Sequence, residues 1–446
     1  MRLRASFSLA ALFAISSIAA LAQLAPLPFK PDLTVAADGS GDFKTIQAAV
    51  TSIPKTNRER IVIFVKDGTY HEKVRVDASY VTLRGQSRAS TRLEFAQAMG
   101  DYRGGQRDNL GQAVLNINGD DFVLENFTVQ NTHGVLGVHA FAIYGRGDRT
   151  VLEDSDVLSQ GNDTLSLWRT SNGMFSEDAA NHASPNGRYY HARLKVCGSV
   201  DFICPRGWCY MTDCDVTEVN PRTDAAMWHD GSRDQDMKFV MHSCRFDGPE
   251  DFRLARHHHD ALFMFLDCTF AKTMRDFAPY RVIYPLNGGT PTPADIQNNK
   301  DHDPTNIWGE RAYYFNSHRI GGDYAWHKDN LVSAPGAPTP EQVTAKWTFG
   351  GKWDPENKTG PAVKNISSNA SQFTVTFAEN VTVKGHPRLA LRDGTFADYA
   401  SGSGTDKLVF TASAPDAAAA KFDFSSGAIV ATEASATLRL TSVALP

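Results

Sequence analysis

Two aspartates follow similar short segments of the chain at nearly equal numbers of residues. Asp163 stands in residues 161–165, Gly-Asn-Asp-Thr-Leu, and Asp201 stands in residues 198–203, Gly-Ser-Val-Asp-Phe-Ile. Two carboxyl groups held close together cannot both ionise cheaply, so the pKa of one of them rises. Such a pair supplies one nucleophile or base and one acid. The alternative is a pair of turn aspartates, because both motifs are also common turn formers.

A repeat would bring these two aspartates together. Short segments with a similar alternation of apolar and polar residues recur at 123–129, 151–157, 190–196, 210–216, 240–246 and 264–270. Their alignment places six residues in one column: Phe127, Ser155, Leu194, Cys214, Cys244 and Cys268. One such strand cannot bury its apolar face alone, whereas a stack of them can. The repeat therefore predicts a solenoid in which equivalent positions of adjacent coils lie side by side.

The chain has six cysteines, and three of them fall in this column. Neighbouring rungs of a sheet lie about 4.8 Å apart, and free cysteine is often buried. We therefore expect Cys214, Cys244 and Cys268 to pack as small apolar side chains rather than to form disulfides. Cys204 and Cys209 could pair, and the sequence leaves this open. The cysteine spacings do not match a zinc site.

The bulk properties indicate an exported globular protein. The 446 residues are 42% hydrophobic and 21% charged, and the net charge of −5 argues against a nucleic-acid binder. Arg2 and Arg4 precede an apolar stretch that ends in a small-residue cleavage pattern at 20–22. We therefore expect residues 1–22 to be a signal peptide, with a secreted or periplasmic product. No later segment is apolar enough to span a membrane, so no membrane association is expected after cleavage.

The residue pattern of the chain changes at about the start of its C-terminal fifth. Residues 23–354 hold the repeat, and residues 355–361 read as a linker. Residues 362–446 show alternating apolar residues separated by turns rich in glycine and serine. This pattern predicts a small antiparallel β-sandwich of the immunoglobulin-like type. We see no catalytic cluster in it.

Several ordered motifs resemble those of the pectin methylesterase (pectinesterase) family. They cover roughly residues 33 to 350, and the matching segments are 35–50, 68–74, 131–134, 162–165, 198–203 and 311–318. The resemblance implies a right-handed parallel β-helix, which agrees with the repeat. It also implies that Asp201 is the nucleophile, that Asp163 is the acid and base, and that Arg256 pairs with Asp201. Such an enzyme demethylates pectin without a cofactor, and we expect a monomer.

The chain departs from the family at three positions. His139 and Asn162 stand where the family has two glutamines that stabilise the oxyanion; both can donate hydrogen bonds. His258 replaces a tryptophan of the sugar-binding floor. Stacking surfaces for the sugar are then expected from Trp168, Tyr190 or Trp326. Gln112 lies too early in the chain to be the missing glutamine.

Other polar groups near the motifs are weaker candidates for a part in substrate or metal binding. Arg169 and Arg188 flank an insertion and are either partners for a uronate carboxylate or ordinary loop charges. The run 257–259 is all histidine, but side chains on a strand alternate faces, so no metal site is expected there. The alternatives to pectin demethylation are an esterase for another acyl group, such as acetyl, and a non-catalytic β-helix that binds polysaccharide.

Overall fold

The computed structural model describes residues 31–431. The exceptions within this span are residues 59, 106, 170–186, 223–224, 230–236, 258–260, 286–287, 300–311, 357–362, 370, 394, 413–418 and 424–426. The predicted signal peptide, most of the predicted linker and the end of the predicted C-terminal domain lie outside the described residues.

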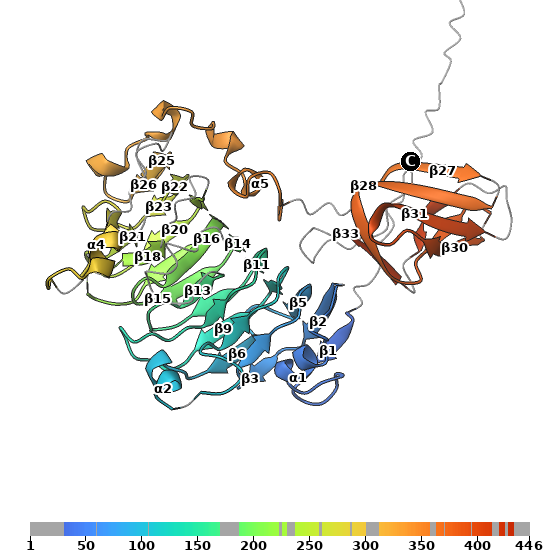
Figure 1. Ribbon diagram of the computed structural model, residues 1–446, viewed down its shortest axis with the longest axis horizontal. Helices are drawn as coiled ribbons and strands as arrows, with labels where there is room; N and C mark the ends of the chain where they lie inside the picture. The colour runs from blue at the N-terminus through green and yellow to red at the C-terminus, as the bar shows by residue number, and fades with distance from the viewer. Residues whose placement is uncertain are drawn as a thin grey trace, which may run out of the picture.

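Most of the chain winds through three parallel sheets (Figure 1). Sheet 1 contains β4 (Val74–Val76), β7 (Leu115–Ile117), β10 (Ile143–Gly145), β13 (Leu165–Trp168), β16 (Ile203–Thr212), β18 (Ala225–His229), β21 (Arg253–His257) and β24 (Tyr280–Arg281). Sheet 2 contains β1 (Leu33–Val35), β2 (Ile61–Val65), β5 (Val81–Gly85), β8 (Val123–Glu125), β11 (Thr150–Glu153), β14 (Gly187–Ala192), the second part of β16, β19 (Phe239–His242), β22 (Phe263–Leu266) and β25 (Ala312–Phe315). Sheet 3 contains β3 (Gly68–Tyr70), β6 (Thr91–Phe95), β9 (Thr128–Asn131), β12 (Asp156–Leu158), β15 (Lys195–Gly198), β17 (Asp215–Glu218), β20 (Arg245–Asp247), β23 (Thr269–Phe270) and β26 (His318–Arg319).

The predicted right-handed parallel β-helix is confirmed. Between the two ends, each coil contributes one strand to each sheet, and each of these strands pairs in parallel with the equivalent strand of the adjacent coil. The inward-facing residues of the three sheets form one continuous apolar core along the axis, from Val35 to Tyr314. Burial of that core is the main favourable term for a fold whose strands are too short to be stable alone.

The predicted column is also confirmed, and the structure extends it by one residue. The registers of sheet 3 place Phe127, Ser155, Leu194, Cys214, Cys244, Cys268 and then Ser317 at the same turn of successive coils. The residue before each of them has a positive φ, between 47° and 56°. The side chains bond along the column; for example, the backbone N–H of Leu194 donates to Cys214 Sγ at 3.4 Å.

All six cysteines are free, so the three column cysteines pack as predicted and Cys204 and Cys209 do not pair. Burial raises the pKa of Cys268 to about 12, which keeps this thiol protonated.

Short helices cover the ends and edges of the β-helix. They are α1 (Ile46–Thr51), α2 (Met99–Gly104), α4 (Pro293–Asn299), α5 (Ala345–Thr348), and the 3-10 turns η1 (Ala325–His327), η2 (Leu331–Ser333) and η3 (Pro340–Gln342). Helix α1 begins at Thr45, whose side chain accepts from the backbone N–H of Ala48. The segment that carries η2, η3 and α5 places Leu331, Val343 and Phe349 in a second apolar cluster on the outer side of sheet 2.

The C-terminal strands are antiparallel. They are β27 (Val363–Asn369), β28 (Gln372–Gly385), β29 (Arg388–Leu391), β30 (Phe396–Ser401), β31 (Thr405–Ala412), β32 (Ala419–Asp423) and β33 (Gly427–Ala431). Their alternating apolar residues, among them Phe373, Val375 and Phe410, form a core of their own. In the described part of the chain, no helix has the length and apolarity needed to cross a membrane.

Candidate active site

Asp163 and Asp201 occupy the same turn of adjacent coils. Leu165 pairs with Ile203 in sheet 1, so the two aspartates, each two residues earlier, stand in register. Both have a positive φ, 57° for Asp163 and 48° for Asp201, a conformation that aspartate tolerates better than most residues. The backbone N–H of Asp163 donates to Val200 O at 3.1 Å, which ties the two turns together. Neighbouring strands are about 4.8 Å apart, so the register places the two aspartates side by side on adjacent coils, as the motif offsets predicted.

Gly198 is required for the close packing of these two turns. A Cβ atom at this position would lie 2.1 Å from Phe202 Cβ and 2.5 Å from Thr164 Oγ1, and both neighbours belong to the aspartate-bearing turns. Gly198→Ala is therefore expected to destabilise the β-helix by about 1–3 kcal/mol, as overpacking of a filled interior does. Chemical denaturation followed by tryptophan fluorescence measures this loss.

The matched control is Gly100→Ala in α2, where an added Cβ meets nothing within 4 Å. It should leave the denaturation midpoint within experimental error. Equal midpoints for the two variants would contradict the packing argument.

Arg256 forms a bidentate pair with Asp201. Its Nε donates to Asp201 Oδ1 at 2.8 Å and its Nη2 to Asp201 Oδ2 at 2.6 Å. Burial alone would lower the pKa of Arg256, but the hydrogen bond and charge of Asp201 outweigh it and raise that pKa above the ordinary value. The guanidinium therefore stays charged, and it favours the ionised form of Asp201. The predicted partnership of these two residues is present in the structure.

His139 and Asn162 flank Asp163. His139 Nε2 lies 3.3 Å from Asp163 Oδ2, and the His139 side chain is 45% exposed. His139 and Asn162 face each other in an isolated parallel bridge. Asn162 donates its side-chain N–H to Gly137 O at 3.0 Å, whereas its buried Oδ1 has no hydrogen-bond partner. Burial, followed by the charge of Arg103, lowers the pKa of His139.

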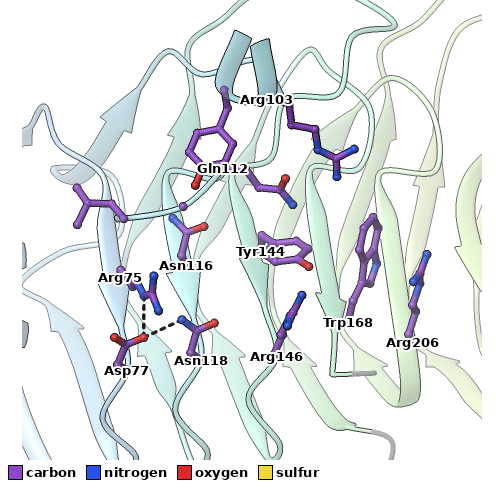
Figure 2. Close-up of a pocket in the computed structure, with 13 residues that line it drawn as sticks. Arg75, Asp77, Arg103, Gln112, Asn116, Asn118, Tyr144, Arg146, Trp168 and Arg206 are labelled. Atoms are coloured by element: carbon purple, nitrogen blue, oxygen red, sulfur yellow. Dashed lines mark hydrogen bonds and ion pairs between the residues drawn. The ribbon is translucent and has the colours of Figure 1, made fainter. Parts of the chain in front are cut away.

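A trough runs over the outer face of sheet 1 (Figure 2). Its volume is about 710 Å³. Tyr144 in the trough and Arg256 stand in one row of the register, which passes through Ser166 and Trp228, so the trough and the aspartates share a face of the sheet. The lining includes the predicted Trp168 and also Gln112, which Figure 2 shows beside the trough. Gln112 belongs to the coil before that of His139, so it does not occupy the position of the family glutamine that His139 replaces.

The trough is rich in arginine. Arg75, Arg103, Arg146 and Arg206 line it, whereas Asp77 is the single carboxylate in the lining. The guanidinium of Arg206 lies 4.2 Å from the centre of the Trp168 ring, so one face of that ring is covered by a cation. An arginine-rich trough with aromatic walls suits an anionic sugar polymer.

Two predicted substrate-binding residues lie elsewhere. Tyr190 is on β14 in sheet 2, where it stacks on Tyr210 at 6.1 Å and its hydroxyl lies 3.4 Å from Glu356 Oε1. It is 3% exposed, so its predicted contact with substrate is wrong. Trp326 lies in η1, with its indole donating to Asp276 at 3.0 Å and its ring against Tyr314, so it packs on the last coil.

His258 lies outside the described residues. The histidine run therefore contributes only His257 to the described structure. Among the described residues, no group of three or more His, Cys, Asp or Glu side chains gathers in a way that could hold a metal ion.

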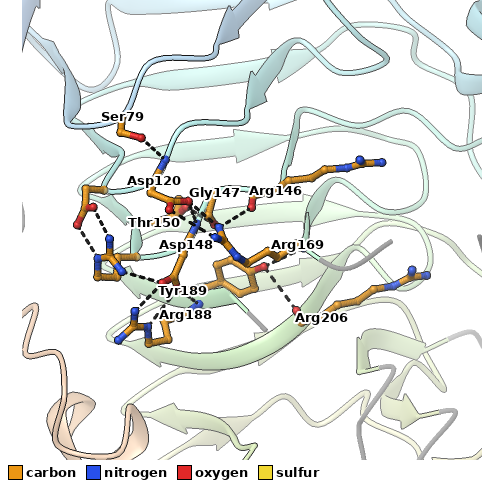
Figure 3. A network of polar contacts seen from close by, with 12 residues as sticks. Ser79, Asp120, Arg146, Gly147, Asp148, Thr150, Arg169, Arg188, Tyr189 and Arg206 are labelled. Atoms are coloured by element: carbon orange, nitrogen blue, oxygen red, sulfur yellow. Dashed lines mark hydrogen bonds and ion pairs between the residues drawn. The ribbon is translucent and has the colours of Figure 1, made fainter. Parts of the chain in front are cut away.

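Arg169 and Arg188 are engaged in a structural network (Figure 3). Arg169 Nη1 donates to Asp120 Oδ1 at 2.6 Å, and Arg188 donates to Asp148 from Nη2 at 2.5 Å and from its backbone at 2.9 Å. These carboxylates already neutralise both cations. The interpretation of the two arginines as partners of a uronate carboxylate is therefore not supported. Arg169 follows β13 and Arg188 lies on β14 rather than in a loop, and both form structural ion pairs.

Three further residues lie at the site without a sequence signal that selects them: Trp228 and Tyr280 against Arg256, and Arg103 near His139. Trp228 lies beneath Arg256, with the guanidinium 5.3 Å from the ring centre. Tyr280 pairs with Arg256 in the register of β21 and β24. Arg103 comes from α2. The alternation of strand residues outward from Met227 could have revealed Trp228, but Arg103 reaches the site from a helix between two coils and leaves no periodic signal.

Comparison with known proteins relates both the sequence and the fold to one group. The sequence profile of the pectinesterase family matches residues 32–264, more than half of the chain. A probable pectinesterase/pectinesterase inhibitor from Arabidopsis thaliana is 31% identical over 194 residues, which are 43% of this chain and 30% of the relative. A pectinesterase from Petunia integrifolia is 28% identical over 194 residues, 43% of this chain and 46% of the relative. The match spans less than half the length of these curated relatives.

Solved structures of the same group share the fold. A pectin methylesterase from carrot superposes with a TM-score of 0.53 and 18% identity, over 73% of this chain and 96% of the other. One from Erwinia chrysanthemi gives a TM-score of 0.55 and 19% identity, over 74% and 99%. A third pectin methylesterase, solved in complex with a hexasaccharide, gives 0.55 and 20% over the same shares.

Proposed function

This chain belongs to the pectinesterase family, and from that premise we propose that it hydrolyses the methyl esters of polygalacturonate. The observation that carries the proposal is the bidentate pair between Arg256 and Asp201. Asp201 stands in register with Asp163 on the adjacent coil. An ionised carboxylate beside a second carboxyl group is what an aspartate nucleophile and its acid partner require.

In the first step, a carboxylate oxygen of Asp201 attacks the ester carbonyl carbon and forms a tetrahedral intermediate. The bond to the methoxy oxygen then breaks, and Asp163 gives its proton to that oxygen, so methanol leaves. An anhydride between Asp201 and the uronate remains. Arg256 holds Asp201 ionised and oriented by its two hydrogen bonds.

In the second step, Asp163 is a carboxylate and acts as the base. It takes a proton from water, and the hydroxide attacks the uronate carbonyl carbon. The bond to Asp201 breaks, so Asp201 leaves as a carboxylate and the uronate is released as its free acid form. Asp163 ends the cycle protonated, as it began.

The oxyanion of each intermediate needs a hydrogen-bond donor. His139 is half-exposed next to Asp163, which suits this part. Asn162 has one amide hydrogen committed to Gly137 O, which leaves its second hydrogen for the site. The arginine-rich trough would bind the polymer, and a solved relative of the same fold was captured with a hexasaccharide.

The organisation of the protein follows the same proposal. Residues 1–22 act as an export signal, residues 23–354 are the esterase domain, and residues 362–446 form a separate immunoglobulin-like domain after the linker 355–361. Export would bring the enzyme to its polymeric substrate outside the cytoplasm.

Methanol release from highly methylated pectin tests the function, with acetate release from acetylated pectin measured beside it. We expect methanol without acetate. Acetate alone would show an esterase for another acyl group. Neither product, together with retention of the protein on a pectin column, would show a polysaccharide-binding β-helix and overturn the proposal.

A further inference from the structure

His139 replaces an amide side chain with one that can carry a proton, and it does so against the acid of the pair. His139 Nε2 is 3.3 Å from Asp163 Oδ2, a distance at which a small shift makes a hydrogen bond. The backbone of His139 also forms a parallel β-bridge with Asn162, the residue before Asp163. The contact is therefore built into the register of two adjacent coils.

We propose that His139 and Asp163 hold one proton in common, so that His139, besides its part at the oxyanion, stores the proton that Asp163 delivers to the leaving alcohol. The inference rests on the proposed function, because it assigns the proton source for the same ester cleavage. When Asp163 is protonated, neutral His139 accepts its hydrogen bond. When the proton moves to the imidazole, the resulting cation pairs with the Asp163 carboxylate.

The groups around His139 act on this pair in opposite directions. The Asp163 carboxylate, in the turn before β13, favours the imidazolium, and so does the charge of Asp201 on the next coil. Helix α2 packs on His139 through the Met99 N–H, which donates to His139 O at 2.8 Å, and it brings Arg103, whose charge disfavours the imidazolium. Burial and Arg103 lower the pKa of His139, so the common proton is shifted toward Asp163, from which it passes to the leaving alcohol.

The consequence is a particular shape of the pH profile. A pair with two places for one proton retains that proton to higher pH than a single carboxyl group does. Acylation needs the proton, so the alkaline limb of kcat/KM for methyl esters should lie at higher pH with histidine than with glutamine. A merely structural or hydrogen-bonding role would leave the limb in place.

The experiment compares pH profiles of kcat/KM for wild type and His139→Gln, which restores the amide found in the family. We expect His139→Gln to remain active, with its alkaline limb moved to lower pH by about one unit. With an aryl ester, whose leaving group needs no proton, the two limbs should coincide. The matched control is His133→Gln. The His133 imidazole lies 4.0 Å from the Asp101 carboxylate and not beside Asp163, so this variant should keep the alkaline limb of the wild type.

Coincident alkaline limbs on the methyl ester would overturn the proposal while leaving the esterase assignment intact. If His139→Gln does not fold, the imidazole is followed directly by ¹⁵N NMR in wild type and Asp163→Asn. The His139 pKa should fall when the carboxylate is removed, and an unchanged pKa would overturn the shared proton. If the wild-type protein did not hydrolyse methyl esters at all, the proposed function itself would be refuted.

Discussion

Replacing Asp201 with asparagine is expected to lower kcat for methyl ester hydrolysis by on the order of 10⁴-fold or more, because an amide cannot attack the ester carbonyl. The substitution conserves shape, and asparagine tolerates the positive φ of 48° at this position. Arg256 keeps one hydrogen-bond acceptor in the amide oxygen. Methanol release at saturating pectin measures the loss, and circular dichroism checks that the variant is folded.

The control is Asp215→Asn, which breaks another aspartate–arginine pair of the β-helix. Asp215 lies 3.0 Å from Arg245 on the solvent side of sheet 3, and both side chains are more than half exposed. This variant should hydrolyse pectin as the wild type does. Turnover of Asp201→Asn above one hundredth of the wild-type rate would contradict the assignment of the nucleophile.

Replacing Asp163 with asparagine should separate the two halves of the reaction. The methyl ester reaction loses its acid, so we expect kcat/KM to fall about 10²- to 10⁴-fold. An aryl ester of the same uronate has a leaving group that departs unprotonated, so Asp201 should still be acylated. The base for the second step is also missing, so the acyl-enzyme should accumulate after a stoichiometric burst of phenol. Mass spectrometry of the quenched protein then finds the uronyl group on the peptide with Asp201.

Asp154→Asn is the matched control for this variant. Asp154 also has a positive φ, 49°, but it lies in the turn between β11 and β12, where Arg193 Nε lies 2.6 Å from its carboxylate. It should show no burst and normal turnover. Steady turnover of the aryl ester by Asp163→Asn would show that another group acts as the base.

The coil register was predictable because it leaves a local signal. Each coil repeats one turn, and the small or apolar residue in that turn appears in the sequence as the column from Phe127 to Cys268. Once coils are aligned, equal offsets place Asp163 beside Asp201. The partner Arg256 followed only from the resemblance, since one further coil, that of β18, lies between its strand and that of Asp201.

The walls of the site were less predictable because the repeat does not tell which of three sheets a strand joins. Tyr190 lies between the turns of Asp163 and Asp201 in the sequence, which suggests a place at the substrate. Its strand β14 belongs to sheet 2, however, and its ring is covered by the segment that carries η2, η3 and α5. The trough depends on arginines brought from separate coils and from α2. Their convergence is a property of the stacked structure and has no counterpart in any one segment.

The stacking of coils also spreads the site over a long stretch of the chain. His139, Asp163, Asp201 and Arg256 stand on four different coils, and the coil of Trp228 lies between the last two. A ribosome delivers these coils one after another, and each new coil has only its predecessor to pack against. Asp201 therefore precedes Arg256 along the chain by the whole coil of Trp228. A chain that ended before the coil of Arg256 would hold the aspartate pair without its countercharge, so the proposed activity would require that later coil as well.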